Sequence, residues 1–172
     1  MHLSDAIKLI EKADWKSAGN TWADFGCGDG LFTQALAHQL PPESSIWAID
    51  KEKSLRKFEA SGVNIDFIKA DFVKDELQLP PLDGLLMANA LHYVKDKVGF
   101  LKKMNKSLKP HSKFLLIEYD TDTPVPVWVP YPISFEKAKI FFPSQGYRTI
   151  TKLGERSSVY GRANIYAAWM ER

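Results

Sequence analysis

Short apolar runs recur along the chain, and the segments between them carry apolar residues at helical spacing. Five runs are typical of buried strands, at residues 20–25, 45–50, 64–71, 83–89 and 113–119. Three intervening segments predict helices over residues 31–40, 51–60 and 95–108, which are expected to end at Pro41, Gly62 and Pro110. This alternation predicts a doubly wound parallel sheet with right-handed crossovers.

The two ends of the chain depart from this alternation. An amphipathic N-terminal helix is expected within residues 1–17, and the proline-rich stretch 121–133 is interpreted as an ordered loop. After a helix over 135–142, the runs "YRTITKL" and "NIYAAWM" predict two strands with no helix between them, which can pair antiparallel. The expected fold class is α/β, with a single seven-stranded, mostly parallel sheet and a C-terminal antiparallel hairpin.

Composition and charge fit one globular domain over residues 1–172. The chain is 45% hydrophobic, 26% charged and 12% aromatic, which argues against disorder. Its formal charge of +2 comes from interspersed residues, apart from a basic cluster at Lys102, Lys103, Lys106 and Lys109. The helical spacing of that cluster favours a solvated helix face over a nucleic-acid footprint.

Cysteine usage and hydropathy indicate a cytoplasmic protein. Cys27 is the only cysteine, so an internal disulfide and a cysteine-based metal cluster are both excluded. The N-terminus lacks the pattern of a signal peptide, and no apolar run approaches the roughly 20 residues that span a bilayer. We therefore expect neither a membrane segment nor a metal site.

The stretch "ADFGCGDG", residues 23–30, follows the first predicted strand. Gly26, Gly28 and Gly30 would lie in the first strand-to-helix turn, where open parallel sheets bind ligands and where bare backbone permits close approach. A dinucleotide motif would place its third glycine at Leu31, and Asp29 would repel a pyrophosphate. No Gly-Lys-Ser/Thr follows, which excludes a P-loop.

This turn resembles the first motif of class I methyltransferases that use S-adenosylmethionine, Glu/Asp-x-Gly-x-Gly-x-Gly. Three further features follow in the order of that family: Asp50 after the second strand, Asp71 after the third, and "ANALHYV" after the fourth. The resemblance covers about residues 18–120 by motif and the C-terminal hairpin by pattern. It implies S-adenosylmethionine as cofactor and S-adenosylhomocysteine as product.

The resemblance also implies roles for individual residues at the cofactor. Gly26 and Gly28 would pass under its methionine part, with Asp24 near the ammonium, directly or through water. Asp50 would accept both ribose hydroxyls. The complete implied set of cofactor residues is Asp24, Gly26, Cys27, Gly28, Gly30, Asp50, Lys51, Asp71, Phe72 and Asn89.

In that set, Asp71 would receive the adenine amino group, the Phe72 amide would meet the ring, and Asn89 would offer its backbone carbonyl to the ammonium. Each carboxylate also has a structural alternative. Asp24 and Asp50 could cap helices, and Asp71 could be a turn residue. Cys27 is expected to be a small buried filler.

Methyl transfer to a small-molecule acceptor needs alignment more than it needs a catalytic group. If the acceptor must lose a proton, His92 is the candidate base, with a structural histidine as the alternative. Tyr93, Glu118 and Tyr119 are candidate acceptor contacts, and Trp128 and Tyr131 a candidate aromatic wall. The chain lacks the Asp/Asn-Pro-Pro-Tyr/Phe and Pro-Cys motifs of nucleic-acid methyltransferases, so no nucleic acid is expected as substrate.

Two other functions remain open at this point. The protein could be a non-catalytic partner subunit that has the methyltransferase fold. Because the chain is short for the family, a homodimer or a partner subunit could be needed to close its pocket. A nicotinamide-dependent dehydrogenase is the third alternative, which the glycine spacing and the terminal hairpin disfavour. Retention of all the acidic residues and glycines of the motif favours the enzyme.

Overall fold

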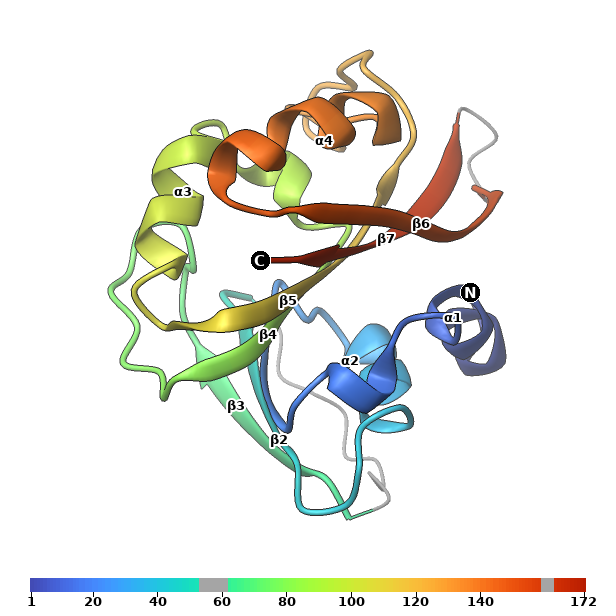
Figure 1. Cartoon of the computed structure of the whole chain (residues 1–172). Coiled ribbons are helices and arrows are strands. Elements are labelled where there is room, and N and C mark those ends of the chain that lie inside the picture. The colour runs from blue at the N-terminus through green and yellow to red at the C-terminus, as the bar shows by residue number, and fades with distance from the viewer. Residues whose placement is uncertain (53–61, 159–162) are drawn as a thin grey trace.

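The computed structural model describes residues 1–52, 62–158 and 163–172, and these residues form a sheet of seven strands with helices on both faces (Figure 1). The strand order is β3-β2-β1-β4-β5-β7-β6. The strands are β1 Thr21–Phe25, β2 Ser45–Asp50, β3 Asn64–Lys69, β4 Leu82–Ala88, β5 Leu108–Tyr119, β6 Thr149–Ser157 and β7 Asn164–Glu171. The helices are α1 Leu3–Ile10, α2 Leu31–Ala37, α3 Lys97–Met104 and α4 Phe135–Phe141.

Strand pairing confirms the predicted fold class. The first five strands pair in parallel, and β7 lies antiparallel between β5 and β6. Strand β1 pairs with β2 on one side and with β4 on the other, so the strand order reverses there. In open α/β sheets a ligand binds beyond the carboxyl ends of the strands at this point, so the topology directs attention to the turn after β1.

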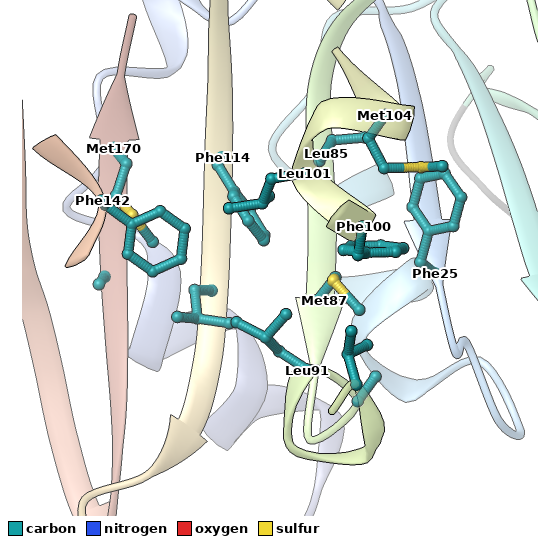
Figure 2. Packing of buried hydrophobic residues seen from close by; sticks show 14 of the residues in the cluster. Phe25, Leu85, Met87, Leu91, Phe100, Leu101, Met104, Phe114, Phe142 and Met170 are labelled. Atoms are coloured by element: carbon teal, nitrogen blue, oxygen red, sulfur yellow. The ribbon is translucent and has the colours of Figure 1, made fainter. Parts of the chain in front are cut away.

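Helices α3 and α4 cover one face of the sheet (Figure 1). Figure 2 shows Phe100, Leu101 and Met104 of α3 packed among side chains from the strands below. The rings of Phe25 and Phe100 meet edge to face with centroids 6.2 Å apart. Since Phe25 ends β1, this packing fixes the strand whose following turn carries the glycines.

Helices α1 and α2 cover the opposite face, over a cluster of three indoles. Trp22 of β1 stacks on Trp169 of β7 with centroids 5.8 Å apart, and Trp15 meets the edge of Trp169 at 5.2 Å. The Trp22 ring also lies against Gly84 of β4, where a Cβ would come within 2.5 Å of it. Gly84 therefore allows a large ring to pack directly on the central strand.

Several boundaries differ from those expected from the sequence. Helix α3 runs from Lys97, where the Asp96 side chain caps it, only to Met104. Strand β5 already begins at Leu108 and contains Pro110, which was expected to end the preceding helix. The pairing with β4 jumps from Leu82–Leu108 to Gly84–Lys113, so Pro110 lies in a bulge where it need not donate a ladder hydrogen bond.

The same shift changes the basic cluster. Lys109 lies on β5 and pairs with Asp83 at 2.8 Å, so it does not belong to a helix face as predicted. The N-terminal helix is also shorter than expected, because α1 ends at Ile10 and a separate 3₁₀ turn spans Trp15–Ser17. The helix predicted over 51–60 lies outside the described residues except for its first two positions. Among the described helices, none has the length and apolar character needed to cross a bilayer.

Candidate functional site

A cavity of about 1120 Å³ lies at the carboxyl ends of the parallel strands. It brings together residues that follow four different strands of the sheet. They include Asp24, Gly28, Asp50, Asp71, Phe72 and Asn89. The residues expected to bind a cofactor are therefore close in space, although they span more than sixty positions of the chain. Gly30 is the exception, since it is the N-cap of α2 and is not among the described residues that line the cavity.

The glycines of the turn after β1 have positive φ angles, and two of them serve different purposes. At Gly26, a Cβ would come within 2.7 Å of the Ala90 Cβ, so this glycine permits close packing of the turn on the end of β4. At Gly28, where φ is 57°, a Cβ would meet no atom within 4 Å among the described residues. Gly28 therefore presents bare backbone to open cavity space, as a closely approaching ligand requires.

Asp50 links the end of β2 to the glycine turn. Its Oδ2 accepts a hydrogen bond from the Gly28 amide at 2.9 Å, and its Oδ1 accepts one from the Glu52 amide at 2.9 Å. A carboxylate has about four acceptor sites and no donors, which suits it to accept hydroxyl groups of a ligand. The carboxylate also fixes the backbone of the turn that the ligand would approach.

Asp24 is buried beneath the turn and is not the cap of α2. The N-cap position of that helix is Gly30, and no side chain caps it. The Thr33 hydroxyl donates to Asp24 Oδ2 at 2.6 Å, whereas Oδ1 is buried and has no hydrogen-bond partner among the described residues. Burial raises the pKa of Asp24 to about 7, Thr33 opposes this shift, and the charge of Asp50 adds to it.

Thr33 was not among the residues singled out from the sequence. It lies on the buried side of α2, nine positions after Asp24, and nothing in its local spacing distinguishes it from a core threonine. Cys27, in contrast, is buried as expected. Burial and the carboxylates of Asp24 and Asp50 raise the pKa of its thiol, which excludes an activated thiolate.

Asp71 and Asn89 lie on the two sides of the turn. Asp71 Oδ1 accepts from the Val73 and Lys74 amides at 3.1 and 3.3 Å, so the turn role considered as an alternative is present, and the residue also lines the cavity. Asn89 has a φ of 52°, and its Oδ1 is buried with no hydrogen-bond partner among the described residues. Two residues that line the cavity, Asp24 and Asn89, therefore each have a buried oxygen atom that accepts no hydrogen bond from the described residues.

His92 and Glu118 form a buried pair next to the cavity. The His92 Nδ1 lies 2.7 Å from Glu118 Oε2, and the His92 amide donates to Oε1 at 3.0 Å. The His92 residue is only 2% exposed, and neither member of the pair is among the described residues that line the cavity. Their neighbours Tyr93 and Tyr119 do line it. The pair joins the end of β5 to the 3₁₀ turn Leu91–Tyr93 and so positions both tyrosines.

The predicted aromatic wall of Trp128 and Tyr131 is not part of the cavity lining among the described residues. Trp128 is 70% exposed, and neither it nor Tyr131 is among the described residues that line the cavity. Val127, from the same loop, does line it. Nothing in the sequence distinguishes Val127, because a valine between a proline and a tryptophan is typical of ordinary loop packing.

A family profile described as "Methyltransferase domain" matches residues 23–111, from the glycine turn to β5. This match covers half of the chain and includes the strands that carry Asp24, Asp50 and Asn89. The chain belongs to this methyltransferase family. Its fold and its site motifs place it in the class I group that uses S-adenosylmethionine.

Curated relatives support the assignment over part of their length. The ubiquinone/menaquinone biosynthesis C-methyltransferase of Pseudomonas fluorescens is 28% identical over 113 residues, which cover 62% of this chain and 44% of that protein. The 2-phytyl-1,4-naphtoquinone methyltransferase of Nostoc punctiforme is 24% identical over 135 residues, covering 68% and 58%. The methyltransferase chain thus spans about half the length of the curated relatives it matches.

Solved structures share the fold. Human N-acetylserotonin methyltransferase, in complex with S-adenosylmethionine, matches 98% of this chain and 51% of its own with a TM-score of 0.70 and 21% identity. A methyltransferase from Aquifex aeolicus matches 99% of this chain and 98% of its own with a TM-score of 0.60 and 18% identity. The same fold therefore also occurs in a methyltransferase chain of similar length.

Proposed function

We propose that this protein transfers a methyl group from S-adenosylmethionine to a small-molecule acceptor. The observation that carries the proposal is the single cavity that combines the open backbone at Gly28 with the acidic ends of β1 and β2. Asp50 joins the two through its bond to the Gly28 amide, so cofactor affinity is expected to depend on it. Membership of the methyltransferase family supports the same reaction.

The donors and acceptors of the cavity fit this cofactor. Its ammonium group would supply N–H donors next to the unpartnered oxygens of Asp24 and Asn89, with the Asn89 backbone carbonyl as a further acceptor. Asp50 would accept the ribose hydroxyls, and Asp71 with Phe72 would hold the adenine ring. The bare backbone at Gly28 leaves room for the methionine part.

When bound, S-adenosylmethionine supplies an electrophilic methyl group on a sulfonium. The residues of the chain then contribute mainly by binding, by orienting the acceptor and by excluding water. His92 is proposed to hold Tyr93 and Tyr119 in place through Glu118, as their hydrogen bonds and burial support. The alternative role of His92 is that of a base that takes a proton from the acceptor. The variants described below distinguish this role from positioning.

Titration calorimetry with S-adenosylmethionine, S-adenosylhomocysteine and NAD, each added to the purified protein, tests the proposal. We expect the first two to bind and NAD not to bind, because the turn lacks the dinucleotide glycine spacing. Binding of NAD alone would overturn the methyltransferase function. Binding of none of the three would favour the non-catalytic partner subunit.

Replacing Asp50 by alanine is expected to weaken the binding of S-adenosylmethionine by about 2 kcal/mol, or roughly 30-fold in Kd. The variant removes an acceptor for the ligand and also the bond to the Gly28 amide. The matched control is Asp66→Ala, which removes an exposed carboxylate of β3 that does not line the cavity among the described residues. Unchanged affinity of Asp50→Ala would exclude the proposed role.

Replacing His92 by alanine is expected to lower the free energy of unfolding by about 2 to 3 kcal/mol, because the buried Glu118 carboxylate loses a charge-assisted partner. The amide of His92→Asn can donate in its place, so this variant should recover part of the loss. Urea unfolding measures both, with the exposed His111→Ala as control. Equal stability of wild type and His92→Ala would contradict the positioning role.

Turnover of the same variants distinguishes positioning from proton transfer once methyl transfer to an acceptor is measured. A base is absent from both His92→Ala and His92→Asn, so both would lose turnover equally. If His92 only positions its neighbours, His92→Asn retains turnover that His92→Ala loses.

A further inference from the structure

The cavity has two halves of different chemical character. The half beyond β2 and β3 is lined by charged residues, among them Asp50, Lys51 and Lys74. The half beyond β4, β5 and β7 is lined by Tyr93, Tyr119, Val127 and Ile165, and none of these four side chains carries a formal charge. Met1, which bears the N-terminal ammonium, also lines the cavity. The charged Glu118 lies beneath this half, buried and bonded to His92. A charged ligand group would find no countercharge on the four side chains of this wall.

Val127 occupies an unusual position at the edge of the uncharged half. Its φ is 71°, a left-handed conformation that disfavours a β-branched side chain, and it is 82% exposed, so burial does not compensate the strain. It lies at the tip of a tight turn in which Val125 and Val129 exchange two backbone hydrogen bonds of 3.0 and 2.8 Å. A strained, exposed apolar side chain at the edge of a cavity is typical of a ligand contact.

The loop that carries this turn is attached firmly to the rest of the site. The Tyr131 amide donates to the His92 carbonyl at 3.0 Å, and the Lys97 ammonium donates to the Tyr131 carbonyl at 2.7 Å. Further along, the Phe135 amide donates to Asp120 at 2.9 Å. The turn therefore has a fixed base, and Val127 is presented to the cavity by a preorganised segment.

We propose that Val127 and Tyr93 form the two walls of an acceptor subsite for an uncharged aromatic molecule. The proposal rests on the proposed function, since the neighbouring half of the cavity would hold the cofactor. Aromatic rings suit the faces of Tyr93 and Tyr119 and the aliphatic side chain of Val127. A charged acceptor is disfavoured, because its charge would lose hydration without gaining a side-chain partner on these walls.

The test uses 1-naphthol as an uncharged probe and 1-naphthoate as its anionic counterpart, with protein saturated with S-adenosylhomocysteine. Equilibrium dialysis gives the Kd of each probe. Wild type is expected to bind 1-naphthol more tightly than 1-naphthoate. In Val127→Gly the turn is retained, because glycine adopts positive φ without strain, and the side-chain contact is lost.

This variant is expected to bind 1-naphthol about tenfold more weakly, as loss of one buried valine contact implies. Its affinity for S-adenosylhomocysteine should not change. Asparagine also tolerates the left-handed conformation, so Val127→Asn should show the same loss of 1-naphthol binding. Agreement between the two variants makes a folding defect in one of them an insufficient explanation. Ile140→Ala is the matched control, since Ile140 is 79% exposed on α4 and does not line the cavity among the described residues.

Unchanged naphthol binding in both Val127 variants would overturn the subsite, as would failure of 1-naphthol to bind wild type or a preference for 1-naphthoate. Failure of S-adenosylhomocysteine to bind wild type is a different result, which refutes the proposed function itself. The two proposals can therefore fail separately.

Discussion

Gly28→Val is expected to abolish measurable binding of S-adenosylmethionine. The Cβ of a residue at this position points into open cavity space, so the valine side chain would occupy volume that the ligand needs. A loss of at least about 3 kcal/mol, or more than 100-fold in Kd, is expected from such an obstruction. Titration calorimetry measures it, and wild-type affinity in this variant would mean that the turn does not contact the cofactor.

A pair of alanine variants separates obstruction from backbone strain. Gly28 and Gly62 both have positive φ, at 57° and 81°, so an alanine at either position incurs the left-handed penalty of about 1 to 2 kcal/mol in stability. A Cβ at Gly62 would contact Pro42 at 3.4 Å, remote from the cavity lining. Both variants should therefore lose similar stability, whereas only Gly28→Ala should lose cofactor affinity.

Asp24 is expected to make the protein less stable as the pH rises from about 4 to 7. The pKa of this carboxyl is raised from 3.8 to about 7 in the folded state, mainly by burial. Between these two values the folded protein binds a proton that the unfolded chain has lost, so raising the pH favours unfolding. This contribution to the stability of the folded protein is fully present below the pKa of the unfolded chain. It is lost as the pH rises through the pKa of the folded protein, and its total is about 4 kcal/mol.

Urea unfolding of wild type and Asp24→Asn between pH 4.5 and 8.5 measures this contribution. The difference in free energy between the two proteins should change with pH in the direction given above, because asparagine does not titrate. Asp50, whose charge adds to the shift, is retained in both proteins. A difference that stays constant over the whole range would show that Asp24 titrates normally.

The same carboxyl couples proton binding to the cofactor. An ammonium group next to Asp24 would favour the charged form and lower its pKa, so binding would release a proton near pH 6 to 7. S-adenosylmethionine is therefore expected to bind more tightly at pH 7 than at pH 5.5 in wild type, a range in which its own α-ammonium group stays mostly protonated. The Asp24→Asn variant should lack this dependence, which distinguishes Asp24 from the other carboxylates of the cavity.

The amino-acid sequence by itself determined the fold class and indicated where the residues proposed to bind the cofactor lie. Apolar runs of strand length and the glycines after the first of them are local signals, set by side-chain period and by backbone freedom. Because parallel strands end at the same edge of a sheet, Asp24, Asp50 and Asp71 could be expected near one another from the chain alone. The strand boundaries around Pro110 could not, since the bulge there depends on its pairing with β4.

Tertiary structure decided which partners the remaining candidate residues have. The partner of His92 is Glu118, 26 positions away, and the partner of Asp24 is Thr33 on the following helix. Whether His92 faces the cavity or lies beneath it depends on side-chain packing between three elements, and no local pattern encodes that choice. Val127 likewise became a candidate only through its backbone conformation and exposure. Local residue spacing specifies which segments form helices, strands and turns. Burial, backbone strain and hydrogen-bond partners depend on contacts between segments that are distant in the sequence.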